Sequence, residues 1–157
     1  MLIATHLLST LIISRLFSLE TPEVYVALAA GVGIDLDHLI VNTKWLQDVK
    51  NFFQGKKIER GINQHSYCQE PLFGLVFGIM VGIFIHFLIS PIRWWVFPLS
   101  LLSHIILDSF MRFDHWPFFP LSNYKYRGFI PSGTKIELLI STVGLFLFFL
   151  CENCLGR

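Results

Sequence analysis

Two clusters of His and Asp interrupt apolar stretches of this sequence. The string GVGIDLDHLIV contains Asp35, Asp37 and His38, and the string LLSHIILDSF contains His104 and Asp108. Charged side chains inside membrane helices are energetically costly, so they are rare and usually functional. Imidazole nitrogens and carboxylate oxygens are also the ligands that hold catalytic metals. The two clusters therefore predict a metal site within a membrane protein.

The spacing within each cluster suits shared coordination by one helix face. His104 and Asp108 are four residues apart, and Asp35 and His38 are three apart, so each pair lies on one side of a helix. Asp37 is about 160° around an ideal helix from Asp35. We therefore expect Asp37 to orient a ligand, to act as a base, or to bind a second ion.

The remaining histidines differ in what their positions imply. His6 opens the first apolar stretch and His65 lies in a polar loop, and both are candidate ligands. Hydrogen bonding of His6 to Thr5 or Ser9 is the alternative. His86 falls toward the opposite face of the membrane, so we expect it to be a packing residue. The role of His115, in FDHWPFF, stays open.

Composition places the chain among membrane proteins. Of its 157 residues, 54% are hydrophobic and 15% are charged, whereas soluble domains carry about 25% charged residues. The net charge of +1 gives no reason to expect nucleic-acid binding. Three cysteines do not make a disulfide framework. Cys151 and Cys154 lack a second ligand pair for zinc. The sequence indicates no functional role for them or for Cys68.

Five apolar stretches are separated by polar loops, and each predicts a helix. They cover residues 2–18, 23–41, 71–90, 94–110 and 135–151. We predict an all-α integral membrane bundle of about five helices, four or five of them spanning, in a single domain over residues 1–157. Several stretches are shorter than the roughly 20 residues of an ideal span, which tilting can accommodate. Residues 2–18 lack a basic start and a small-residue cleavage site, so we expect a retained helix.

The basic residues predict the orientation. If the helices alternate, nine basic residues lie on the side of the N-terminus and of loops 43–69 and 111–134, against three on the other side. The positive-inside rule then puts both long loops in the cytoplasm of a multi-pass inner-membrane protein. His6, Asp35, His65, His104 and Asp108 all fall at this cytoplasmic level.

Four short motifs occur in an order that resembles a known family. They are Thr5–His6, GIDLDH at Gly33–His38, RGINQHS at Arg60–Ser66, and HIILDSF with WPFFP within His104–Pro120. Together they resemble the LexA-binding, inner-membrane-associated metal-dependent hydrolase family, the YdjM-like proteins. Three positions depart from the family pattern: Ile34 replaces a proline, Glu59 replaces a histidine, and one residue is added before His65. The resemblance implies a divalent metal and hydrolysis.

The candidate ligands outnumber what one zinc ion takes. They are His6, Asp35, His38, His65, His104 and Asp108. Since a structural or catalytic zinc binds about four ligands, two ions sharing a carboxylate would use this set better. We expect zinc or manganese. Asp35, Asp37 and His65 are the expected catalytic residues, and Arg60 is expected to bind an anionic head group.

The leading hypothesis is a hydrolase that cleaves a phosphoester or ester of a lipid or lipid-linked substrate at the cytoplasmic face, with membrane lipids as its partners. A divalent-metal-binding protein or transporter is the second hypothesis, because intramembrane His and Asp also mark ion pathways. Such a path needs polar groups through the whole depth, and the outer half of these helices is almost wholly apolar. A non-catalytic membrane regulator, with a protein partner not identified, is the third.

Overall fold

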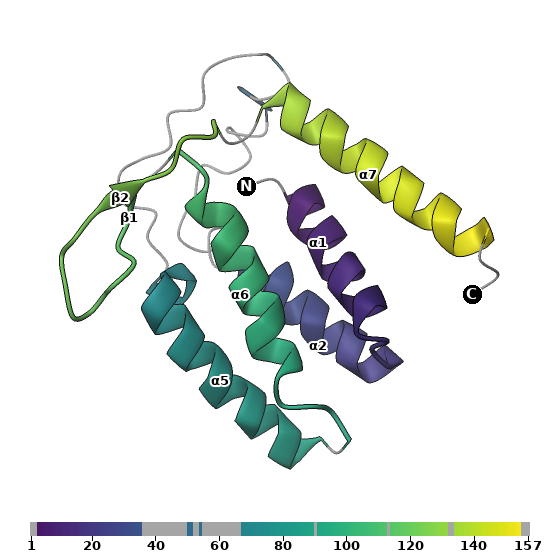
Figure 1. Cartoon of the computed structure of the whole chain (residues 1–157), viewed down its shortest axis with the longest axis horizontal. Helices are drawn as coiled ribbons and strands as arrows, with labels where there is room; N and C mark the ends of the chain where they lie inside the picture. The colour runs from purple at the N-terminus through teal and green to yellow at the C-terminus, as the bar shows by residue number, and fades with distance from the viewer. Residues whose placement is uncertain are drawn as a thin grey trace.

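The computed structural model of the chain describes residues 3–35, 50–51, 54, 67–89, 91–112, 114–131 and 134–154. This part of the chain is mostly helical, which confirms the predicted fold class at that level (Figure 1). Its α-helices are α1 (Ile3–Leu16), α2 (Thr21–Gly31), α5 (Pro71–Leu88), α6 (Val96–Ser109) and α7 (Lys135–Cys154). Two 3-10 turns, η1 (Gly33–Asp35) and η2 (Tyr67–Gln69), and an antiparallel pair of strands, β1 (Asp114–His115) and β2 (Tyr126–Arg127), complete it.

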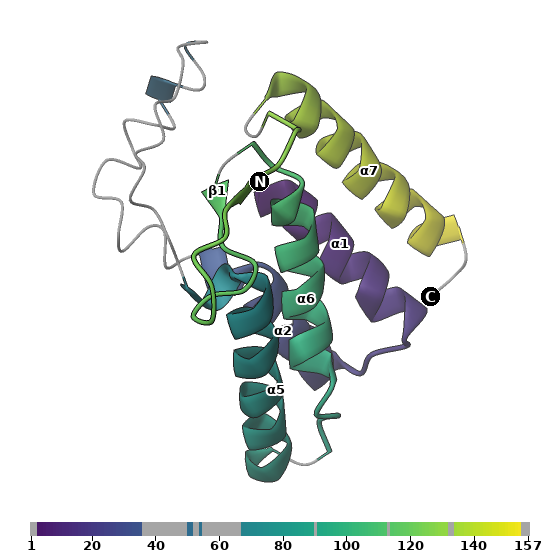
Figure 2. The same cartoon turned by 60° about the vertical axis from the view of Figure 1, so that its left-hand side comes forward.

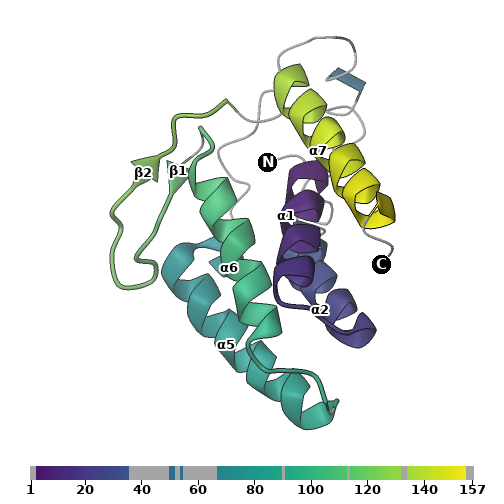
Figure 3. The ribbon, with the colours of Figure 1, turned by 45° about the vertical axis from the view of Figure 1, so that its right-hand side comes forward.

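Helix α6 lies at the centre of the bundle. It contacts α5 along one side and α2 and α1 along the other, and α7 packs alongside α1 (Figures 1 and 3). The buried apolar core gathers around α6 and includes Phe97, Leu101 and Ile105, with Ala30 of α2. Since α6 carries His104 and Asp108, the central position of this helix brings both residues among its neighbours.

Helix α5 approaches α6 closely through a row of glycines. Gly74, Gly78 and Gly82 are four residues apart and buried, and a Cβ on Gly82 would lie 2.2 Å from the Trp94 carbonyl oxygen. Small residues at this spacing let membrane helices pack backbone to backbone. The opposite face of α5 is exposed and wholly apolar. It comprises Leu75, Val76, Ile79, Met80, Ile83, Phe84, Phe87 and Leu88.

Helix α2 begins with a complete capping box. The Glu20 side chain accepts from the backbone at Glu23, the Glu23 side chain accepts from the Glu20 backbone, and Pro22 occupies the first turn. The far end of α2 differs from the prediction. A continuous helix over residues 23–41 is wrong, because α2 ends at Gly31 and a separate 3-10 turn carries Asp35. Glycines at positions 31 and 33 weaken a helix there; residues 36–41 lie outside the described part.

Helix α5 alone, in the described part of the chain, is long and apolar enough to cross a membrane. It has 18 residues with a mean hydropathy of 2.2. Helices α1 and α6 are apolar but have 14 residues each, a length of about 21 Å against a hydrocarbon core of about 30 Å. The other predicted helices match the structure to within three residues at each end, whereas the number of spans stays a prediction.

Candidate metal centre

Three elements bring His6, Asp35, His104 and Asp108 together at one end of the bundle. His6 lies near the start of α1, Asp35 ends the η1 turn after α2, and His104 and Asp108 lie one turn apart near the end of α6. One ligand atom from each residue lies within 4.8 Å of the other three. These four residues could therefore hold one metal ion, and we call them the His–Asp cluster.

Each histidine of the cluster faces both carboxylates. His6 Nε2 lies 3.3 Å from Asp108 Oδ1 and 3.8 Å from Asp35 Oδ2. His104 Nε2 lies 3.5 Å from Asp108 Oδ2 and 3.5 Å from Asp35 Oδ1. The four distances involve both oxygens of each carboxylate, so each aspartate faces both imidazoles. One ligand atom from each of the four residues lies within 4.8 Å of the others, which lets the four residues share one ion.

The hydrogen bonds of His104 fix which nitrogen faces the carboxylates. His104 Nδ1 lies 3.0 Å from the Gly31 carbonyl oxygen, which can only accept, so Nδ1 donates. In the neutral ring, Nε2 then presents a lone pair toward Asp35 and Asp108. A lone pair against two carboxylates is repulsive unless a proton or a cation lies between them. This backbone bond is the support that metal-ligating histidines usually have.

Both histidines and Asp108 are buried, and Asp35 is partly buried. His6 Nδ1, His6 Nε2 and His104 Nε2 are inaccessible to solvent and make no hydrogen bond of standard geometry to the residues that the structure describes. The two imidazole rings stack with centroids 3.9 Å apart and planes 18° apart, and both Nε2 atoms face the carboxylates. Buried polar atoms are nearly always hydrogen-bonded in proteins. Unsatisfied nitrogens beside carboxylates are what a cation would leave when absent, and the residues present fit a divalent metal.

Close packing of α1 on α2 helps to position the residues of the cluster. A Cβ on Gly31 would lie 2.2 Å from Thr10 Oγ1, one turn after His6, so only glycine permits this approach. The same Gly31 supplies the carbonyl that holds His104. Gly33 does not take part in this close approach, because a Cβ there would meet nothing closer than 3.8 Å.

The chain belongs to the YdjM inner membrane protein family. The family matches residues 1–155, which confirms the resemblance drawn from the motifs. No curated protein and no solved structure matches the chain. Membership supports a membrane location and says nothing of catalysis.

The structure does not reach every predicted site residue of this family member. Asp37, His38, Arg60 and His65 lie outside the described residues. Their predicted roles in catalysis, metal binding and substrate binding therefore stay predictions. The four predicted metal ligands that are described, His6, Asp35, His104 and Asp108, are all found in the cluster.

Two further histidines fall outside the cluster. His86 lies at the other end of α5, where its Nδ1 hydrogen-bonds with the Ile92 carbonyl at 2.7 Å, so the prediction of a packing residue is confirmed. His115 is buried beside the end of α6 and hydrogen-bonds with the backbone of Met111 and Asp108. Burial lowers the pKa of His115 below its usual value. Its closeness to Asp108 had no signal in the sequence, because it depends on the β1–β2 pairing.

Proposed function

We propose that this protein is a membrane-bound, metal-dependent hydrolase of a phosphoester or ester in a lipid or lipid-linked substrate, working at the cytoplasmic face of the inner membrane. The single observation that carries the proposal is the pair of buried Nε2 atoms of His6 and His104, which face two carboxylates closely enough for the four residues to share one ion. A divalent ion bound by these four residues would polarise the scissile group and activate water.

The residues of the chain have separate tasks in this proposal. His104 is held in a ligating tautomer by the Gly31 carbonyl, and His6 is aligned by stacking on it. Asp35 and Asp108 supply the negative charge that selects a cation. Asp37 and His65 are proposed to accept the proton of water, and Arg60 to bind the anionic head group. If two ions are bound, His38 and His65 would supply the additional ligands.

A metal transporter without hydrolysis is the second candidate, and one observation favours it. The buried hydroxyls of Thr10 and Ser100 make no hydrogen bond to the residues that the structure describes, and they lie one turn deeper than His6 and His104. They extend the polar surface inward from the cluster. At the far end of the bundle, however, the Glu23 carboxylate is already paired with Arg93, so it offers no free ligand to a passing cation. This pairing favours the hydrolase.

The test is hydrolysis of a panel of lipid phosphates and phosphodiesters by the purified protein in detergent. We expect release of phosphate or head group, lost on chelation and in Asp35→Asn, and kept in the matched control His86→Ala. A metal-loaded protein that hydrolyses nothing but moves divalent ions into liposomes would favour the transporter. If Asp35→Asn and His104→Ala both leave the cellular phenotype intact, a non-catalytic regulator remains.

The proposed orientation has its own test. Asn123 is exposed in the segment that joins β1 to β2, at the same end of the bundle as the His–Asp cluster (Figure 1). We expect a cysteine at this position to resist membrane-impermeant maleimides in intact cells and to react after lysis. Efficient labelling from outside would place the cluster on the other face.

A further inference from the structure

We call residues 110–131 the hairpin, because this segment contains the β1–β2 pair. Several of its apolar side chains are exposed to solvent. Phe118, Tyr124 and Phe129 are each more than half exposed, and Leu121 is 82% exposed. Together they form an apolar surface on a segment with little regular structure. Apolar patches of this kind mark membrane or protein contacts.

Hydrogen bonds fix the hairpin at the beginning of helix α5. The Leu72 amide donates to the Pro117 carbonyl at 3.1 Å, and the Trp116 amide donates to Glu70 Oε2 at 2.7 Å. Helix α5 rises about 27 Å over its 18 residues, close to the thickness of the hydrocarbon core. A spanning α5 would therefore have its first turn at a membrane boundary, and the hairpin lies beside this turn (Figure 2).

The hairpin is also attached to the end of α6. The Tyr126 hydroxyl donates to the Ser109 carbonyl at the end of α6. Within the hairpin, the Tyr126 ring stacks on buried His115, and the Arg112 amide donates to the Ile130 carbonyl at 2.7 Å. A Cβ on Gly128 would lie 2.2 Å from the Met111 carbonyl oxygen, so this contact requires glycine. With two anchored ends, the exposed side chains are held at a defined depth.

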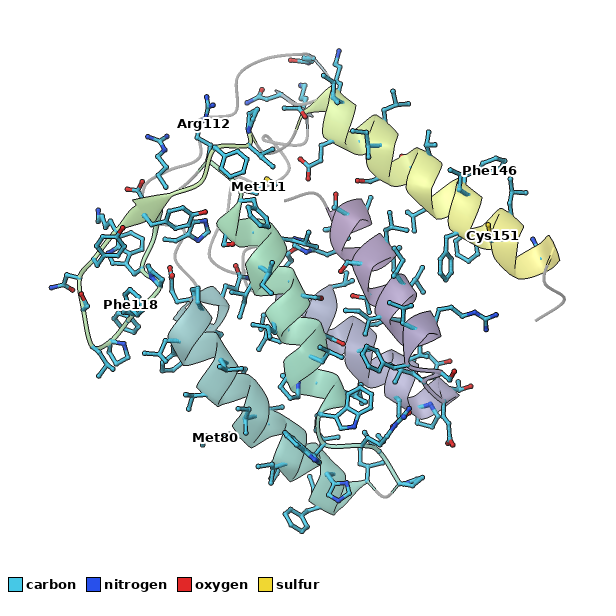
Figure 4. All side chains as sticks on the ribbon, in the orientation of Figure 1. Met80, Met111, Arg112, Phe118, Phe146 and Cys151 are labelled. Atoms are coloured by element: carbon cyan, nitrogen blue, oxygen red, sulfur yellow. The ribbon has the colours of Figure 1, made fainter. Side chains whose placement is uncertain are left out.

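The hairpin carries more positive than negative charge. Arg112, Lys125 and Arg127 are exposed, against a single carboxylate at Asp114. Lys125 Nζ lies 3.7 Å from Asp114 Oδ2 and 4.7 Å from the centre of the Trp116 ring. Aromatic and basic residues together are characteristic of the headgroup level, where anionic lipids attract Lys and Arg. Figure 4 shows Arg112 and Phe118 on the hairpin side of the bundle.

We propose that the hairpin lies in the headgroup layer and binds anionic phospholipid, with Lys125 and Arg127 contacting the phosphate and Leu121 and Phe118 entering the acyl boundary. The occupant is lipid rather than a second copy of the chain, because the surface combines a net positive charge with a position at the membrane boundary. This inference concerns lipid contact alone and does not depend on hydrolysis.

The depth of the hairpin is the first test. A bimane fluorophore is attached to Leu121→Cys, and separately to Met80→Cys as a reference for the middle of α5, with the three native cysteines replaced by serine. Vesicles contain phosphatidylcholine brominated either near the carbonyl or near the chain end. We expect the Leu121 label to be quenched more by the shallow bromine and the Met80 label more by the deep one. Quenching of the Leu121 label only by aqueous iodide would overturn the proposal.

Lipid selectivity is the second test. In vesicles of equimolar phosphatidylglycerol and phosphatidylcholine, either lipid carries the shallow bromine. We expect phosphatidylglycerol to quench the Leu121 label preferentially, and Lys125→Gln with Arg127→Gln to lower this preference at least about twofold. Lys135→Gln, which removes a charge outside the hairpin at the same end, should lower it less. Equal quenching by both lipids in the starting protein would rule out anionic selectivity.

Two measurements keep the result interpretable. If the serine background fails to fold, the native cysteines are kept and the quenching of tryptophan fluorescence is compared between the starting protein and Trp116→Phe, with the same expected depth. If the Leu121 label escapes lipid quenching but becomes protected as protein concentration rises, the surface binds a second copy and the lipid proposal is wrong. Both readouts are independent of activity, so an inactive protein leaves this inference intact.

Discussion

The two ends of the bundle both bury charge, but they satisfy it differently. At one end Glu23 and Arg93 form a clasp between the start of α2 and the turn before α6. Glu23 Oε1 accepts from the Arg93 amide at 3.0 Å and from Arg93 Nε at 2.7 Å, while Oε2 accepts from Arg93 Nη2 and from the Glu20 amide. At the other end, the Nε2 atoms of the His–Asp cluster make no hydrogen bond within the part of the chain that the structure describes.

From this difference we infer a structural role for the Glu23–Arg93 clasp and a functional role for the His–Asp cluster. The clasp is complete without any added group, because each carboxylate oxygen of Glu23 has two donors. The His–Asp cluster brings two acceptor carboxylates against two histidines, one of which is oriented with its lone pair inward. Its histidine nitrogens and carboxylate oxygens gain favourable partners only when a cation binds between them or when protons are added. The end with unsatisfied nitrogens is therefore where a ligand should bind, and the clasp should respond to mutation alone.

The largest expected effect is loss of metal from the cluster. His104→Ala or Asp108→Asn should weaken binding of zinc or manganese at least about a hundredfold, because each removes a direct ligand while second-layer changes alone cost about 10- to 100-fold. Elemental analysis after gentle purification and reconstitution measures it. His86→Ala is the matched control, since it removes an imidazole from another helix outside the cluster and should keep its metal. A starting protein that takes up no metal would refute the site.

The second effect concerns the clasp. Arg93→Gln leaves the buried Glu23 carboxylate without its cation and should lower the temperature of thermal unfolding. Replacing both residues, as Glu23→Leu with Arg93→Leu, should restore much of this loss, because apolar pairs often replace buried ion pairs well. Thermal unfolding in detergent measures both. Metal content should be unchanged in every clasp variant; a loss of metal there would show that the two ends are coupled.

Local spacing and topology predicted much of the cluster. The four-residue spacing placed His104 and Asp108 on one face, and alternation of the helices put His6 and Asp35 at the same end. The sequence did not predict the 3-10 turn at Gly33–Asp35, since helix propensity is a weak guide near two glycines. It also missed the Gly31 carbonyl as the partner of His104, because a backbone group leaves no mark in the sequence. The hairpin depends on long-range pairing, and the sequence assigned those residues only to a loop.

The third effect is the loss of stability when a chelator removes the metal, and it tests whether the two ends of the bundle are independent. With free metal at about 100 times its Kd, binding stabilises the folded protein by about 2.7 kcal/mol, and chelation should remove this amount. The starting protein and Arg93→Gln should lose the same amount of stability on chelation, because the effects of changes at distant sites are additive. The stability of Asp108→Asn should not change on chelation. Melting curves with and without chelator test it, and an unequal loss in Arg93→Gln would contradict independence of the two ends.

The smallest effect comes from the packing that positions His104. Gly31→Ala puts a Cβ where Thr10 Oγ1 lies, so α1 must move from α2 and the Gly31 carbonyl must shift relative to His104. We expect metal affinity to fall about tenfold, the range of changes that act through a supporting group. Thr10→Ala with Gly31→Ala removes the clashing oxygen and should restore most of the affinity. Gly33→Ala is the matched control, since its nearest neighbour would be 3.8 Å away. Equal losses at both glycines would mean that helix propensity, rather than close approach, governs the cluster, and the supporting role of the Gly31 carbonyl would then be wrong.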